Sequence, residues 1–277
     1  MKLHVIDTGF FKLDGGAMFG VVPKSIWQKT NPSDSNNLCN WAMRCLLIED
    51  GNRLILIDNG IGEKQDAKFL SHYHLNGEAS LQRSLQRLDI SESDITDVFM
   101  THLHFDHCGG GIMYKSGKPA LSFVNARYWS NADHWQWATE PNPREKASFL
   151  KENILPIQES GHLNFVVPGS SPFQNTEIRY VSGHTDKMMI PCISFKGETV
   201  CFMADLLPST GHIPLPYIMG YDTRPLLTME EKDAFLNEAA DRNFILFFEH
   251  DPVNECCTVK RTEKGIRLDR TFALKEI

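Results

Sequence analysis

Short apolar runs bounded by polar or turn-forming residues recur along the chain and predict β-strands. Such runs cover residues 3–6, 45–48, 54–57, 97–100, 178–181, 199–202 and 244–247. The second and third runs flank the turn sequence Asp50-Gly51-Asn52, so we expect them to form a hairpin.

Helical periodicity occurs between these runs. The expected helices cover residues 78–88, 125–137, 144–158 and 229–240. In the first, Leu81, Leu85 and Leu88 recur at helical spacing, and the last opens with a capping box of Thr228 and Glu231. The pattern therefore predicts an α/β protein in which sheets form the centre and helices cover them.

A dense group of metal-ligand residue types follows the run 97–100. In Thr101-His102-Leu103-His104-Phe105-Asp106-His107, three imidazoles and one carboxylate lie within six residues. Protonated imidazoles this close would repel one another, and buried ones would stay unpaired, unless a cation binds their lone pairs. The sequence therefore predicts a metal site.

The spacing within this motif indicates more than one ion. Alternate residues of an extended chain point to the same side, so His102 and His104 can bind one ion together. Asp106 and His107 are adjacent, so they can join His102 and His104 at the same ion only if the chain bends between the two pairs. The glycines at 109–111 have the composition of a sharp turn. We therefore expect Asp106 and His107 to face a second ion.

Further candidate ligands follow later strands. They are His184, Asp205 and His250, each a few residues beyond an apolar run. His72 and His74 share the HxH spacing but precede a helix, and no Asp-His follows them, so we expect no ligand role for this pair. Isolated histidines are expected to be structural or solvated: His4, His134 and His162.

Taken together, these motifs resemble the metallo-β-lactamase superfamily, in which an HxHxDH motif is followed by a His, an Asp and a His at strand ends. The resemblance covers roughly residues 43 to 251. It implies a four-layer αββα metallo-β-lactamase sandwich. We expect residues 1–277 to form a single hydrolase domain, which is a size that one large core can support.

The resemblance also implies a division of the ligands. His102, His104 and His184 would bind the first ion, Asp106, His107 and His250 the second, and Asp205 would bridge both. Asp58, at the end of an early strand, resembles a supporting aspartate that orients a ligating histidine. Nitrogen and oxygen donors without thiolate suit zinc, and also manganese, iron or cobalt. We therefore expect two divalent ions and favour zinc as their identity.

A carboxylate at Asp205 favours the lactonase-like branches, because the penicillin-cleaving members have a cysteine there. We expect hydrolysis of a lactone or small ester, with N-acyl homoserine lactones and hence quorum quenching as the leading class. The nucleophile would be a hydroxide held between the ions, with Asp106 as proton carrier. The alternatives are an organophosphate triesterase and a non-hydrolytic diiron redox or metal-binding protein.

The substrate pocket is less well defined by the sequence. The residues that we expect to line it are Met18, Phe19, Trp27, His212, Tyr217 and Tyr221. The apolar segment 16–27 is predicted to be an ordered loop, and its side chains could equally cap the core. Known homoserine lactonases carry a tyrosine near the position of Pro208, so another donor from this loop would have to replace it.

Composition and charge limit the partners, the compartment and the substrates that we expect for this chain. The net charge of −7, with both signs interspersed, gives no basic surface for nucleic acid. Seven scattered cysteines suggest a reducing compartment, and an early Asp7 and the lack of long apolar stretches predict a cytoplasmic chain without leader or membrane helix. The 27 residues after His250 are too few for the added domain of glyoxalase II, so glutathione thioesters are less favoured as substrates. A homodimer is compatible with the apolar loops.

Overall fold

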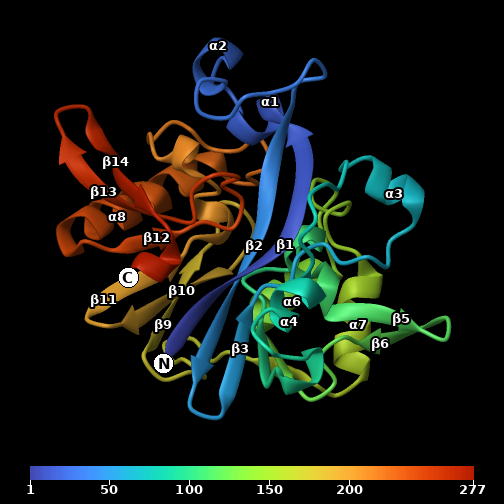
Figure 1. Cartoon of the computed structure of the whole chain (residues 1–277). Coiled ribbons are helices and arrows are strands. Elements are labelled where there is room, and N and C mark those ends of the chain that lie inside the picture. The colour runs from blue at the N-terminus through green and yellow to red at the C-terminus, as the bar shows by residue number, and fades with distance from the viewer. The chain divides into compact units, whose positions relative to one another are not determined.

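The computed structural model describes residues 1–277 and divides into two compact units (Figure 1). Unit 1 consists of Met1–Gly9 and Met43–Pro172, and unit 2 of Phe10–Ala42 and Phe173–Ile277. Two of the three boundaries fall within the long strands β1 and β2, which therefore contribute residues to both units. None of the helices is long and apolar enough to span a bilayer.

The first six-stranded sheet has the order β1-β2-β3-β4-β7-β8. Its strands are β1 (Lys2–Asp14), β2 (Leu38–Asp50), β3 (Arg53–Ile57), β4 (Asp97–Phe99), β7 (Arg127–Ser130) and β8 (Leu163–Phe165). β2 and β3 form the predicted hairpin, with Asp50 opposite Arg53, and strands β3, β4, β7 and β8 run parallel. Parallel neighbours end at the same edge of a sheet, so the residues after β3 and β4 meet there.

Unit 1 contains five α-helices. They are α3 (Ala67–Ser71), α4 (Leu81–Gln86), α5 (Phe105–Cys108), α6 (Ala132–Thr139) and α7 (Lys151–Glu159), with 3-10 turns η1 (Glu92–Asp94) and η2 (Gly109–Gly111). Leu81 and Leu85 of α4 lie in one buried cluster with Leu56 of β3 and Val98 of β4. A small hairpin, β5 (Ile112–Lys115) and β6 (Lys118–Leu121), packs against α7.

Two of the predicted helices, α6 and α7, begin seven residues later than expected, whereas α4 begins three residues later. Residues 127–130 are strand β7 because they pair with β4, and Asn131 then caps α6 with its side chain. Residues 144–149 are not helical, since the Asn142 side chain accepts from the backbone N–H groups of Arg144 and Glu145. Such local hydrogen bonds compete with helix formation.

Unit 2 contains the second six-stranded sheet, in the order β14-β13-β12-β11-β10-β9. Its strands are β9 (Thr176–Val181), β10 (Met188–Phe195), β11 (Glu198–Phe202), β12 (Ile245–Phe247), β13 (Cys256–Thr262) and β14 (Gly265–Phe272). β9 and β11 are both antiparallel to β10, and β12 is parallel to β11. The carboxyl ends of β9, β11 and β12 therefore lie at one edge.

The helices of unit 2 are dominated by one long element. They are α1 (Gly15–Phe19), α2 (Lys24–Trp27) and α8 (Pro225–Arg242), with 3-10 turns η3 (Ala204–Leu206), η4 (Thr210–His212) and η5 (Leu274–Glu276). α8 packs on β13 and β14. The predicted loop 16–27 thus contains two short helices, because Asp14 caps the first with its carboxylate.

The predicted start of α8 is wrong. The helix begins at Pro225, a residue well suited to the first turn, so Thr228 lies inside it and does not cap it. Glu231 instead accepts hydrogen bonds from another loop, through Ser182 and Gly183. Each unit nevertheless has one sheet with helices against it, which are the components that a four-layer αββα sandwich requires, and the α/β class is confirmed.

The glycines after the HxHxDH motif serve close packing and do not form the sharp turn that we expected. Gly109 has helical backbone angles, with φ −65° and ψ −35°. A Cβ on Gly110 would overlap the carbonyl oxygen of Asn59, and one on Gly109 that of Ile61. Side chains here would push the motif away from the segment that follows β3.

We predict that Gly110→Ala lowers the free energy of unfolding by about 1–3 kcal/mol through this overlap. Thermal unfolding followed by circular dichroism measures the loss. Gly117→Asn is the matched control, because that position has nothing within 4 Å and a φ of +75° that asparagine tolerates. Equal effects of the two changes would contradict the packing role of Gly110.

Candidate metal centre

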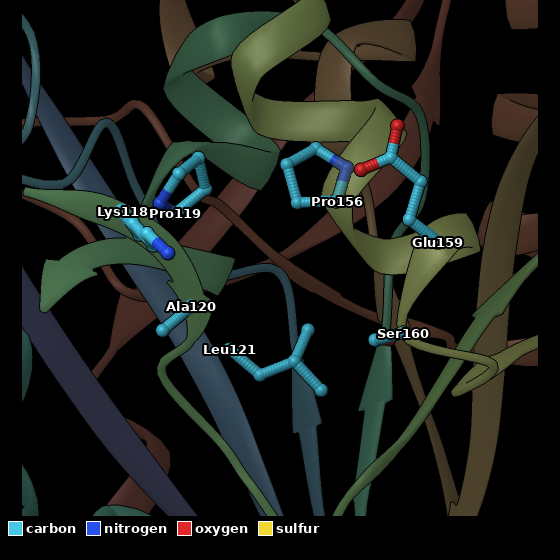
Figure 2. A pocket seen from close by; sticks show the side chains of 7 residues that line it. All are labelled: Lys118, Pro119, Ala120, Leu121, Pro156, Glu159 and Ser160. Carbon is cyan, nitrogen blue, oxygen red and sulfur yellow. The ribbon is translucent and has the colours of Figure 1, made fainter.

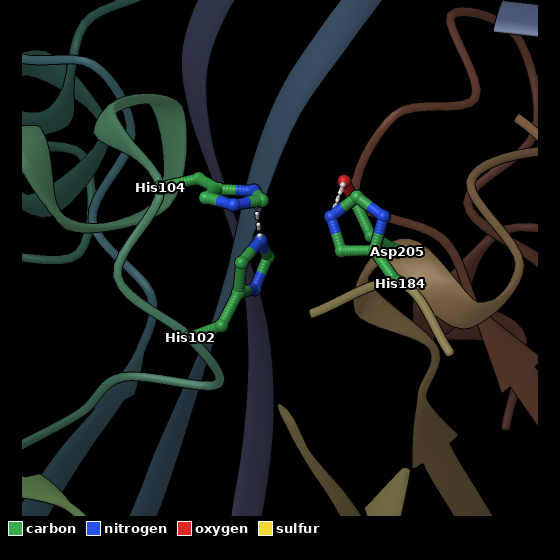
Figure 3. A group of neighbouring side chains, drawn as sticks. All are labelled: His102, His104, His184 and Asp205. Atoms are coloured by element: carbon green, nitrogen blue, oxygen red, sulfur yellow. Dashed lines mark hydrogen bonds and ion pairs between the residues drawn. The ribbon is translucent and has the colours of Figure 1, made fainter. Parts of the chain in front are cut away.

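In unit 1, the segment after β4 presents the HxHxDH motif from a short extended stretch followed by helix α5. His102 and His104 lie on the extended part, and their rings are nearly perpendicular, with His102 Nε2 3.1 Å from His104 Nδ1 (Figure 3). Asp106 and His107 lie on α5, so the bend required between the two ligand pairs is a helical turn. All four side chains are buried or nearly so.

Asp58 organises this segment from the end of β3. It has a φ of +55°, a conformation that non-glycine residues rarely adopt, and its side chain is fully buried. Its carboxylate accepts from the backbone N–H and the hydroxyl of Thr101, both at 2.7 Å, and lies 3.1 Å from His107 Nδ1. Asp58 therefore fixes the orientation of the His107 ring.

Thr101 extends the influence of Asp58 to a second histidine. Its only hydroxyl proton is donated to Asp58, so the same oxygen must accept from His102 Nδ1, which lies 3.0 Å away. This direction places the proton of neutral His102 on Nδ1 and leaves the lone pair of Nε2 available. One carboxylate thus sets the tautomers of both His102 and His107.

Two residues that sequence reasoning did not connect to this segment support it. His134, expected to be merely structural, accepts the backbone N–H of Leu103 at 2.9 Å through Nε2. Glu145 is buried, and its Oε1 lies 3.5 Å from His104 Nε2. Its Oε2 accepts from Trp137 Nε1 and Asn142 Nδ2. No local pattern predicted the contacts with Leu103 and His104, because each crosses at least 31 residues of chain.

In unit 2, Asp205 lies between two histidines. Its Oδ2 is 3.1 Å from His184 Nε2, a pair drawn in Figure 3, and its Oδ1 is 3.1 Å from His250 Nε2. The three residues follow β9, β11 and β12, whose carboxyl ends share one edge. Ala204 has a φ of +42°, so the backbone immediately before Asp205 adopts a rarely populated conformation.

The other nitrogen of each of these histidines is held by the protein. His184 Nδ1 lies 2.9 Å from Asp222 Oδ1, and His250 Nδ1 lies 2.7 Å from the carbonyl oxygen of Ala42. Burial lowers the pKa of His184, but Asp205 and Asp222 outweigh it and raise that pKa to about 10. An imidazole between two carboxylates binds a cation strongly, and a metal ion can take the place of the proton.

These observations fit a divalent metal. In His102, His107, His184 and His250, Nδ1 has an oxygen partner and Nε2 is the nitrogen turned toward other ligand candidates or left for an ion. This division of the two nitrogens is typical of metal-binding histidines. The donors are imidazoles and carboxylates, which suit zinc and other first-row metals.

Three of the six residues predicted to line a pocket form a buried aromatic stack in unit 2. The Phe19 ring lies parallel to Trp27 at 5.4 Å on one side and to His212 at 4.3 Å on the other. Met18, Phe19, Trp27 and His212 are all buried, whereas Tyr217 is half-buried and Tyr221 is 41% exposed. Contact of these residues with substrate stays a prediction.

His212 uses both ring nitrogens within the protein. Nε2 lies 2.9 Å from the carbonyl oxygen of Met18 and must donate to it, so Nδ1 accepts from the Ser209 hydroxyl at 2.8 Å. Burial lowers the pKa of His212 to about 3. The ring is therefore neutral and joins the loop after Asp205 to α1.

A surface hollow in unit 1 is lined by β6 and α7 (Figure 2). It has a volume of about 360 Å³ and is lined by Lys118, Pro119, Ala120, Leu121, Pro156, Glu159 and Ser160. No predicted site residue contributes to it. We assign it no part in the chemistry.

The family model described as "Metallo-beta-lactamase superfamily" matches residues 44–250, which is more than half of the chain. The chain belongs to the metallo-β-lactamase superfamily. The predicted family and fold are thereby confirmed. The match contains the HxHxDH motif, His184, Asp205 and His250.

Solved structures share the fold of this chain. A "probable metal-dependent hydrolase" from Staphylococcus aureus is 28% identical, with a TM-score of 0.89 and coverage of 100% of this chain and 98% of that one. AidC, a dizinc quorum-quenching lactonase, is 22% identical, with a TM-score of 0.81 over 98% of this chain and 95% of that one. At that identity AidC supports the fold alone.

A curated relative is also similar. The N-acyl homoserine lactonase AiiB of Rhizobium rhizogenes is 29% identical over 148 residues, which cover 48% of this chain and 52% of that protein. The chain thus spans about half the length of the curated relatives it matches.

We predict that Thr101→Val weakens metal binding by about 10- to 100-fold, because His102 loses the acceptor that fixes its tautomer. Thr101→Ser, which keeps the hydroxyl, should restore most of the affinity. Competition with a chromophoric chelator gives the affinities. A valine variant that binds metal like the wild type would show that the hydroxyl does not control His102.

We predict that His212 contributes to acid sensitivity. Its pKa of about 3 lies below the unfolded value near 6.5, so the unfolded chain binds the extra proton and stability falls as pH drops from about 6.5 toward 3. In His212→Gln the acid-side slope of unfolding free energy should decrease by up to about 1.4 kcal/mol per pH unit. Urea unfolding at several pH values measures the slope, and NMR detection of a charged His212 at pH 5 would refute the assignment.

Proposed function

We propose that this protein is a metal-dependent hydrolase that opens a lactone or a similar small ester, with N-acyl homoserine lactones as the first class to test. The observation that carries the proposal is the position of Asp205, whose two carboxylate oxygens each face a different histidine nitrogen. A carboxylate so placed has one oxygen available for each of two ions. Membership of the metallo-β-lactamase superfamily supports this arrangement.

We propose that the ligand groups of the two units act together in one catalytic domain over residues 1–277. His102, His104 and His184 would hold one ion, Asp106, His107 and His250 the other, and Asp205 both. Asp58 supports His107 directly and His102 through Thr101. Two divalent ions, zinc first, would supply Lewis acidity that polarises an ester carbonyl and lowers the pKa of water.

The side chains then have distinct tasks in ring opening. Water adds to the lactone carbonyl, the bond between the carbonyl carbon and the ring oxygen breaks, and the ring oxygen must gain a proton. Asp106 is our candidate carrier of that proton, because it is a carboxylate beside His107, with 3.8 Å between Oδ2 and Nε2. The product is an open-chain hydroxy acid, so turnover releases acid at neutral pH.

The choice of lactone rests on relatives and on the ligand set. AiiB, the curated relative at 29% identity, is an N-acyl homoserine lactonase. The residue three positions after Asp205 is Pro208, which offers no hydrogen-bond donor. Because both nitrogens of His212 are engaged, we propose Tyr217 or Tyr221 as the donor to the substrate carbonyl.

The test combines metal analysis with turnover. We expect about two zinc ions per chain, and zinc-dependent acid release from homoserine lactones with a kcat/KM above about 10⁴ M⁻¹s⁻¹, the lower range for ordinary enzymes. Asp205→Asn should fold, lose metal and lose at least about 100-fold in turnover. Asp133→Asn, on the exposed face of α6, is the matched control.

The outcomes separate the alternatives. Two zinc ions without turnover across the acyl series would remove lactones and direct the search to phosphotriesters and other esters. Bound iron with reversible reduction and no hydrolysis would favour a redox protein. A fully active Asp205→Asn variant would refute the bridging role.

A further inference from the structure

Two adjacent residues of α8, Glu231 and Lys232, each bind a different loop of unit 2. Glu231 Oε1 accepts from the Ser182 backbone N–H at 2.7 Å, and Oε2 accepts from that of Gly183 at 2.9 Å. Both N–H groups immediately precede His184. The helix approaches this loop so closely that a Cβ on Gly183 would overlap the backbone of Thr228. The loop that presents His184 is therefore fixed directly on α8.

Lys232 fixes the second loop. Its Nζ donates to the carbonyl oxygens of His212 at 3.0 Å, Pro214 at 3.2 Å and Tyr217 at 2.7 Å. The side chain is 1% exposed. Three acceptors match the three N–H bonds of an ammonium group, so Lys232 has none left for chemistry.

The position of Lys232 is costly for a charged group. Burial lowers the pKa of Lys232 to about 7. A buried ammonium is tolerated when its hydrogen bonds are all made, and these carbonyl oxygens make them. The chain thus keeps a polar amine where an apolar side chain would fill the space, which indicates a task for the three bonds.

The two loops meet at His184, and Thr223 and Arg224 bind the same loop close by. The loop held by Lys232 continues to Asp222, whose Oδ1 lies 2.9 Å from His184 Nδ1. Its Oδ2 accepts from the backbone N–H of Met219 at 3.2 Å. The backbone N–H of Thr223 also donates to the carbonyl oxygen of His184 at 3.1 Å. The orientation of the His184 ring thus depends on the relative position of the loops bound by Glu231 and Lys232.

We propose that Glu231 and Lys232 are positioning residues that hold these two loops on α8 in the register that brings Asp222 against His184. This inference rests on the proposed function in one respect, that His184 is a metal ligand. Neither residue touches the reacting atoms. Both act through Asp222, which sets the proton of His184 on Nδ1 and leaves Nε2 for the metal.

The experiment compares Glu231→Gln and Lys232→Met with the full-length wild type. Hydrogen exchange measured by mass spectrometry reports on residues 182–186 and 212–222 in the metal-free and zinc-loaded chain. Chelator competition gives the zinc affinity, and the visible spectrum of the cobalt-loaded chain reports on ligand geometry. Lys196→Met is the matched control, because Lys196 also donates to a backbone carbonyl, that of Ile277, but is exposed.

We expect each variant to speed exchange in the loop that it releases, by about 10-fold or more, and to weaken zinc binding by about 10-fold with a changed cobalt spectrum. Combining either variant with Asp222→Asn should add little further loss of affinity, since all three act on the same imidazole. Lys196→Met should change none of these values.

Faster exchange with unchanged zinc affinity and cobalt spectrum would overturn the proposal, because the residues would then be structural only. Additive losses with Asp222→Asn would also overturn it. If Lys232→Met does not fold, Glu231→Gln still decides, since glutamine keeps the shape of a half-buried side chain but loses one acceptor oxygen. A wild type that binds no metal would refute the proposed function, whereas variants with wild-type affinity would refute the positioning role.

Discussion

An imidazole can offer only one nitrogen lone pair to a metal in a defined direction, and only if its other nitrogen donates a proton to a fixed acceptor. The structure supplies that acceptor for four of the proposed ligands, from Thr101, Asp58, Asp222 and the Ala42 carbonyl. The remaining features of the site follow from placing these acceptors. Strand ends present the histidines, and neighbouring segments hold their outer nitrogens.

Backbone strain is found at two residues, Asp58 and Ala204, that orient or adjoin the ligand candidates. Asp58 and Ala204 both have left-handed backbone conformations, with φ of +55° and +42°. Each such residue costs of the order of 1–3 kcal/mol, which the surrounding contacts must offset. At Asp58 the offset comes from three charge-assisted hydrogen bonds, while Ala204 lies in the fully buried segment between β11 and Asp205. Strained conformations next to ligand candidates are consistent with a site organised before any ion binds.

The sequence predicted what depends on local pattern. Apolar runs marked the strands before His102, His184, Asp205 and His250, and the hairpin turn before Arg53 was correct. Acceptors contributed by distant segments were not predicted. Asp222 lies in an irregular segment without a periodic signal, whereas Glu145 lies in the stretch 144–149 that was predicted to be helical and is not. They reach their histidines across 38 and 41 residues. A local pattern can also mislead, because Thr228 and Glu231 matched a capping box, yet the helix begins at Pro225 and Glu231 binds another loop.

The hydrogen bond between His250 and Ala42 differs from the others because its acceptor belongs to the main chain. Single-nucleotide changes can delete the carboxylates that hold His107 and His184, but every residue type at position 42 would still present a carbonyl oxygen. Ala42 also donates its N–H to the His250 carbonyl, so one backbone and one side-chain hydrogen bond join the pair. Of the four supported histidines, His250 is therefore the one whose orientation is most tolerant of random mutation, and drift in this chain should be constrained at Asp58 and Asp222 far more than at Ala42.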